Sequence, residues 1–266
     1  FMAVGAYTSA LLSIYFTKLG TLPEMLQFPL VLAAGGLVAA LLGLLIGIPV
    51  LRLRGDYLAI ATLGFGEIIR VVILNLDITK GARGLAGIPG YTDFWWAEIF
   101  MLLSIIVIWN TIHSNHGRAM VAVRENEIAA EAMGVNTTYY KVSAFVIGAF
   151  FAGVAGGLFA HYLGYIAPKS FDFMKSIEIL LMVVLGGLGS LTGSVVAAIV
   201  LTGLPELLRF LQTYRMVIYS LTLVLLMLYR PQGLFGCDEA SAVLLKQWFK
   251  RDYHRTGGEA DGSFES

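Results

Sequence analysis

Long stretches without a charged residue constrain this chain more than any other feature of its sequence. Residues 25–51 contain no Asp, Glu, Lys or Arg, and neither do residues 142–168 or 179–205. A helix needs about 20 predominantly apolar residues to cross a bilayer. The chain has 58% hydrophobic and 14% charged residues, whereas about 25% of the residues of a soluble domain are charged. The sequence therefore predicts an all-α polytopic membrane protein, a multi-span helical bundle.

Shorter apolar stretches add further expected spans. These are residues 1–17, 94–112 and about 214–229. The second of them begins with Phe94, Trp95 and Trp96, and such an aromatic belt is typical of the interface between membrane and water.

The chain opens inside an apolar stretch, without a basic region or a small-residue cleavage site. We therefore expect an N-terminally truncated transmembrane domain and no signal peptide. The expected division is a transmembrane domain over residues 1–230 and a polar, partly disordered tail over residues 231–266.

One apolar segment, residues 55–76, carries charges at or near membrane depth: Asp56, Glu67 and Arg70. Ionisable groups in a membrane segment usually face the protein interior or a water-filled path. Glu67 and Arg70 lie three residues apart and can pair on one helix face. We expect a structural ion pair rather than two substrate ligands, with Asp56 near the membrane boundary.

Glycines interrupt the charge-free stretch 179–205. Short, glycine-broken segments are a sequence indication of a transporter's central pathway. The stretch can form two short crossings, a re-entrant hairpin or one kinked helix. The candidates for a translocation path are Gly64, Gly66, Glu67, Arg70, Gly186, Gly187, Gly189, Ser190 and Gly193.

Lys and Arg near the span ends predict the orientation, because such residues concentrate on the cytoplasmic side. Arg52 and Arg54 mark one side, and the Gly-rich loop 77–93 then lies opposite. The next span returns loop 113–141 to the side of Arg52. We expect this loop and the basic C-terminal tail in the cytoplasm, which requires residues 177–205 to count as two crossings or a hairpin.

Loop 113–141 contains good helix formers from Ala119 to Met133, and Gly134 or Asn136 can end a helix in a left-handed conformation. Such a helix suits docking in a partner's groove or lying on the bilayer as a connector. On this helix, Val121, Ile128 and Ala132 would share one face, and Arg124, Glu127 and Glu131 would form a neighbouring charged ridge.

No catalytic or metal-binding constellation is visible in the sequence. There is no nucleotide-binding P-loop motif, and the single cysteine, Cys237, excludes an intrachain disulfide. The formal net charge is zero, so nothing suggests nucleic acid as a partner. We expect no catalytic residue, no bound metal and no cofactor on this chain.

Five segments resemble, in the same order, the LivM type of branched-chain amino acid ABC transporter permease. They are FMAVGAYTSALL at 1–12, GDYLAIATLGFGEIIR at 55–70, GRAMVAVRENEIAAEAMGVN at 117–136, LGGLGSLTGSVVAAIV at 185–200 and YRPQGLFG at 229–236. The chain departs from the generic E-A-A signature of such importers, because Glu127 stands one place early relative to Ala129-Ala130 and Gly134.

The resemblance implies a permease subunit of an ATP-driven importer that takes up Leu, Ile and Val by alternating access. It implies a homologous permease subunit, two cytoplasmic ABC ATPases, an external solute-binding protein and surrounding membrane lipid as partners, in a bacterial or archaeal plasma (inner) membrane. ATP would be used by the partner subunits, so the chain itself would not be an enzyme. The implied ATPase-coupling residues are Arg118, Arg124, Glu125, Glu127, Ala129, Ala130, Glu131 and Gly134.

Other functions remain open at this point. The same machinery can carry urea, short amides or other amino acids, because much of the selectivity of such systems resides in the binding protein. A stand-alone channel or secondary transporter would predict carboxylates for a coupling ion in mid-span, and Glu67 alone fits. A structural membrane anchor would not explain two glycine-broken segments.

Overall fold

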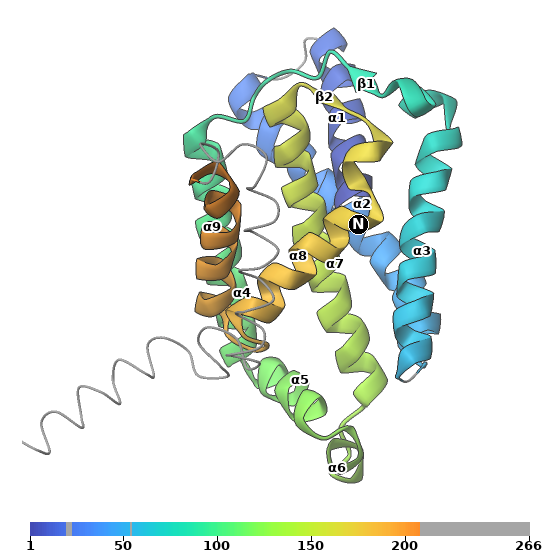
Figure 1. Cartoon of the computed structure of the whole chain (residues 1–266), viewed down its shortest axis with the longest axis vertical. Coiled ribbons are helices and arrows are strands. Elements are labelled where there is room, and N and C mark those ends of the chain that lie inside the picture. Colours follow the sequence, from blue (N-terminus) through green and yellow to red (C-terminus); the bar gives the residue numbers. More distant parts are fainter. Residues whose placement is uncertain (20–22, 54, 208–266) are drawn as a thin grey trace, which may run out of the picture. The chain divides into compact units, whose positions relative to one another are not determined.

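The computed structural model describes residues 1–19, 23–53 and 55–207 (Figure 1). The span expected near residues 214–229, Cys237 and the tail 231–266 lie outside the described residues. The chain divides into two compact units, residues 1–175 and 176–266, and each is described by itself.

The described residues are almost entirely helical. The α-helices are α1 (Met2–Leu19), α2 (Glu24–Val50), α3 (Asp56–Asn75), α4 (Phe94–His113), α5 (Asn115–Glu125), α6 (Glu127–Ala132), α7 (Thr137–Leu163), α8 (Phe173–Gly186) and α9 (Leu191–Leu207). The short 3-10 turns are η1 (Asp77–Thr79), η2 (Gly81–Arg83) and η3 (Pro168–Phe171). Strands β1 (Leu85–Ala86) and β2 (Tyr165–Ile166) pair antiparallel, with Leu85 opposite Ile166.

Among the residues that the structure describes, four helices, α2, α3, α4 and α7, are long and apolar enough to cross a membrane. They correspond to four of the stretches expected to span, although α7 begins at Thr137, five residues before the predicted start of its span. The described helices agree with the predicted all-α, multi-span helical bundle. Helix α1 is not among the four.

The core of the first unit is formed by α1, α2 and α7, which pack side by side (Figure 1). Small residues let these backbones approach closely, as in other membrane helix pairs. Ala6, Ser9 and Ala10 of α1 are fully buried. A Cβ added to Gly5 would collide with the backbone of Gly153 on α7. Helix α1 is therefore a central packing element of this unit.

The loop from α3 to α4 is held against the ends of α1 and α7. Leu85 and Ile88 share a buried cluster with Tyr7 of α1 and Ala160 of α7. The Thr92 hydroxyl donates a hydrogen bond to the Leu158 carbonyl at 3.0 Å. The Gly-rich loop 77–93 is thus folded into two 3-10 turns and a short strand rather than being an open connection.

The glycine-broken stretch forms two separate helices, α8 and α9, which excludes the single kinked helix. The helices have 14 and 17 residues, shorter than the roughly 20 residues that a straight crossing needs. Two short crossings and a re-entrant hairpin both remain compatible with these lengths.

Candidate functional site

The predicted ion pair on α3 is confirmed. Arg70 Nε donates to both carboxylate oxygens of Glu67, at 2.9 and 3.0 Å, and its Nη2 contacts the same carboxylate. The fork geometry of a guanidinium matches a carboxylate in this way. Half of the Glu67 side chain and 29% of that of Arg70 are exposed, so the pair lies on an open face of α3.

The two glycines on this part of α3 mark open space. A Cβ added to Gly64 or Gly66 would meet no atom within 4 Å. Both glycines are exposed, like most apolar side chains of α3. An apolar helix with a bidentate ion pair beside two uncovered glycines presents a face that another membrane component can approach closely.

The second glycine-broken segment is a tight turn between α8 and α9. Gly187 and Gly189 have φ values of 111° and 102°, which L side chains rarely adopt. A Cβ on Gly186 would lie 2.6 Å from the backbone of Gly193, so bulk at this position would separate the helices. Each of these four glycines therefore has a structural reason to be glycine.

Ser190 begins α9. Its buried hydroxyl accepts a hydrogen bond from the backbone N–H of Gly193 at 3.1 Å, as an N-cap residue does. A serine before an apolar run indicates a helix start, and the positions of the apolar stretches alone do not reveal it. The α3 residues and this turn belong to different units, so they form two separately described groups.

The single helix predicted from Ala119 to Met133 is wrong, because the chain breaks at Asn126 into α5 and α6. Asn126 has extended backbone angles, and its side-chain oxygen accepts a hydrogen bond from the Ala129 N–H at 3.0 Å. An asparagine can end one helix and cap the next, and this local bond outweighs the helix propensity of its neighbours.

The sequence predicts that Gly134 or Asn136 ends a helix in a left-handed conformation, and the structure agrees for Gly134. Gly134 has a φ of 82°, the left-handed conformation that follows many helices. Asn136 instead caps the next helix, since its side-chain oxygen accepts a hydrogen bond from the Tyr139 N–H at 3.0 Å. Both ends of α6 are therefore well defined.

The predicted ridge of Arg124, Glu127 and Glu131 is also wrong, because the break at Asn126 separates Arg124 on α5 from the two glutamates on α6. Arg124 pairs with Glu125 at 2.6 Å. Glu127 pairs with Lys141 of α7 at 2.6 Å. Sequence patterns for helices cannot identify a partner 14 residues away on another helix, so the role of Lys141 was missed.

Helix α6 presents an apolar tip. Ile128 is 74% exposed and Met133 is 84% exposed. Ala129 and Glu131 are also exposed, whereas Ala130 is buried and faces its own unit. On α5, the exposed Arg118 donates to the side chain of Asn115. The loop thus presents exposed apolar side chains next to exposed charged ones.

The described residues hold no group of three or more His, Cys, Asp or Glu side chains that could bind a metal ion.

The family model for the permease component of branched-chain amino acid transport systems matches residues 1–229. The chain is 41% identical to the high-affinity branched-chain amino acid transport system permease protein LivM of Salmonella typhimurium and to that of Escherichia coli K12. These alignments cover 88% of the chain and 61% of each relative.

The corresponding permease protein LivH of Escherichia coli K12 is 34% identical, over 63% of the chain and 61% of the relative. No solved structure matches. The chain spans about three fifths of the length of these relatives. It nevertheless matches the family over most of its own length, and it belongs to the permease components of branched-chain amino acid transport systems.

Proposed function

We propose that this chain is the transmembrane permease subunit of an ATP-driven importer that takes up leucine, isoleucine and valine. The observation that carries the proposal is the family match over residues 1–229, together with 41% identity to two LivM proteins. The apolar helices able to span a membrane support it independently.

The proposed mechanism is alternating access between this chain and a homologous permease subunit. The relatives include proteins called LivM and LivH, which supports a pair of different permease chains. ATP would be hydrolysed on two separate cytoplasmic ATPases, and an external solute-binding protein would deliver the substrate. This chain would bind no cofactor and catalyse no reaction.

Helix α6 is the proposed ATPase contact. Its exposed Ile128 and Met133 suit insertion into an apolar groove of a partner. The Glu127–Lys141 pair ties α6 to the first turns of α7. A displacement of α6 by an ATPase would therefore reach α7, which packs along both α1 and α2.

The proposed orientation follows from the same argument. An ATPase can reach α6 only from the cytoplasm, so loop 113–141 would be cytoplasmic and loop 77–93 external. The C-terminal tail would also be cytoplasmic. The face of α3 with Gly64, Gly66, Glu67 and Arg70, and separately the glycine turn 186–193, are the proposed lining of the route.

Uptake by cells tests the proposal. A strain lacking its own branched-chain amino acid permeases should regain uptake of radioactive leucine when it expresses the full-length protein with its partner subunits. Omission of the ATPases should abolish this uptake. Uptake of urea or a short amide, with none of leucine, isoleucine or valine, would contradict the proposed substrate.

A further inference from the structure

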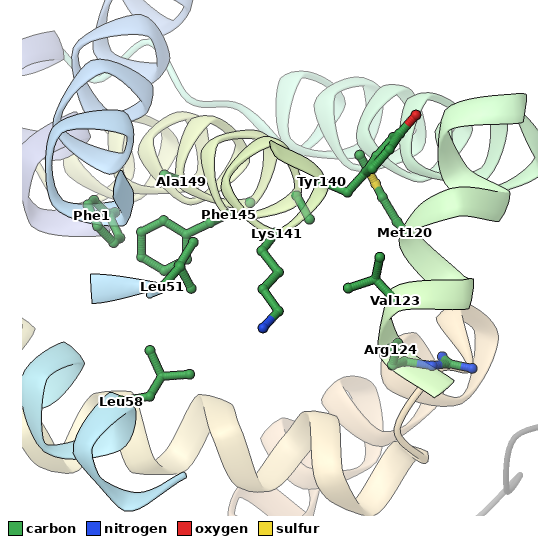
Figure 2. A pocket seen from close by; sticks show the side chains of 12 residues that line it. Phe1, Leu51, Leu58, Met120, Val123, Arg124, Tyr140, Lys141, Phe145 and Ala149 are labelled. Atoms are coloured by element: carbon green, nitrogen blue, oxygen red, sulfur yellow. The ribbon is translucent and has the colours of Figure 1, made fainter. Parts of the chain in front are cut away.

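A cavity of about 640 Å³ lies among the ends of α2, α3, α5 and α7 (Figure 2). Pockets of roughly 300–1,000 Å³ are typical sites for small molecules. Most of its lining is apolar, with Leu51, Leu58, Val123 and Phe145 around the opening shown in Figure 2. Such a surface suits a short aliphatic group.

One cation points into this cavity. The side chain of Lys141 extends from α7 toward the open centre, whereas the guanidinium of Arg124 points away from it (Figure 2). The ammonium of Lys141 contacts the carboxylate of Glu127 at 2.6 Å, and about a quarter of each side chain is exposed. The cavity therefore places a cation, whose carboxylate partner is Glu127, beside an aliphatic surface.

We propose that this cavity is a binding site for a branched-chain amino acid on the side of the membrane where the substrate is released. The side chain would lie against Leu51, Leu58 and Phe145, and the α-carboxylate would bind Lys141. The α-ammonium would bind Glu127. The inference rests on the proposed function, and on the proposed orientation that puts α5 and α6 in the cytoplasm.

Charge balance favours this ligand. When the ligand enters, its two charged groups take the place of the direct contact, so that the zwitterion bridges Glu127 and Lys141 and still links α6 to α7. The number of ion pairs does not fall, and the apolar side chain leaves water, which is favourable. A neutral aliphatic molecule would leave the existing ion pair in place, and a simple anion would displace Lys141 from Glu127 without offering Glu127 a positive charge in return.

The test is binding of radioactive leucine to the purified full-length transporter, with partner permease and ATPases but without binding protein, in phosphatidylcholine nanodiscs. Lys141→Gln should weaken leucine binding about 10-fold or more, since it removes a charge-assisted hydrogen bond. Lys141→Arg should retain most of the affinity. Leucinol, which lacks the carboxylate, should bind weakly to the unaltered protein, and Lys141→Gln should not weaken its binding further, because leucinol offers Lys141 no negative charge.

A second pair of variants tests the space rather than the charge. Gly148 lines the cavity, and a Cβ added to it would meet no atom within 4 Å. Because a Cβ has room at this position, Gly148→Leu should extend a bulky side chain into the cavity and abolish the Lys141-dependent binding. Gly148→Ala is the matched control, and it should change the affinity for leucine by no more than about 3-fold.

Leucine binding that is the same in Lys141→Gln, Gly148→Leu and the unaltered protein would overturn the inference. So would occupancy of the cavity by phosphatidylglycerol but not by leucine, when that lipid is added to the nanodiscs. Neither result affects the proposed function, which is measured separately as ATP-dependent leucine uptake by the unaltered transporter. Absence of that uptake would contradict the proposed function. Absence of leucine binding to the cavity would contradict the inference.

Discussion

The ammonium of Lys141 lies 2.6 Å from the carboxylate of Glu127 and links the start of α6 to the start of α7. Helix α6 has only six residues, too few to be stable without such contacts. The link makes α6 part of the membrane unit instead of a loosely attached loop, which is what a helix that transmits force requires.

The first prediction tests this link. Glu127→Gln should reduce the leucine transported per ATP hydrolysed several-fold, because α6 can then move without moving α7. The double variant Glu127→Lys with Lys141→Glu should restore co-purification of the ATPases relative to Lys141→Glu alone. Lys169→Gln, at an exposed lysine of η3, is the control. Equal ATPase recovery in all four proteins would contradict the role of the pair.

The second prediction concerns the break between α5 and α6. Asn126→Ala removes the side-chain oxygen that caps α6, and loss of such a cap costs about 1 kcal/mol. We expect weaker ATPase binding, measured by co-purification, and faster proteolysis at residues 126–134. Asn126→Asp keeps the oxygen and should behave like the unaltered protein. If alanine and aspartate had the same effect, the cap would not matter.

The third prediction concerns the Glu67–Arg70 pair. Removing either charge leaves the other without its partner on an apolar helix, so each single glutamine variant should lower the yield of assembled transporter. The double variant Glu67→Gln with Arg70→Gln should exceed at least one of them. The yields are measured by size-exclusion chromatography in detergent. Strictly additive losses would show that the two side chains do not interact.

The fourth prediction concerns orientation. In a Cys237→Ser background, a cysteine at the exposed Thr138 should be protected from a membrane-impermeant thiol reagent in intact cells, and one at Asp93 should react. Asp93 is the better external position, since the neighbouring Thr92 is half-buried and hydrogen-bonded to Leu158. The reverse pattern of labelling would invert the proposed topology.

Much of the fold follows from local sequence patterns. Charge-free stretches such as residues 25–51 locate the helices, because a helix satisfies all its backbone polar groups within one continuous apolar segment, as lipid requires. The Glu67–Arg70 pair is also local, since residues three apart share a helix face. The left-handed glycine at Gly134 follows from the same kind of rule.

Two kinds of feature could not be predicted. One depends on competition between helix propensity and a side-chain hydrogen bond, and the other depends on contacts between residues far apart in the sequence. Helix formers on both sides favoured one helix through Asn126, but a single side-chain hydrogen bond divides it. The pairing of Glu127 with Lys141, and the cavity beside it, arise only when α6 folds back toward α7. The central position of α1 depends on glycines such as Gly5 and Gly153, whose close contact no local pattern reveals.

The central claim is that this chain carries branched-chain amino acids with energy received through α6. The most direct measurement is ATP-dependent uptake of radioactive leucine into proteoliposomes that contain the full-length protein, its partner permease, both ATPases and the binding protein. We predict uptake by the unaltered transporter, and a loss of at least 10-fold in Ile128→Asp with Met133→Asp, which destroys the apolar tip of α6 but leaves the membrane helices unchanged. Full uptake by this double variant, with ATPases bound normally, would contradict the account.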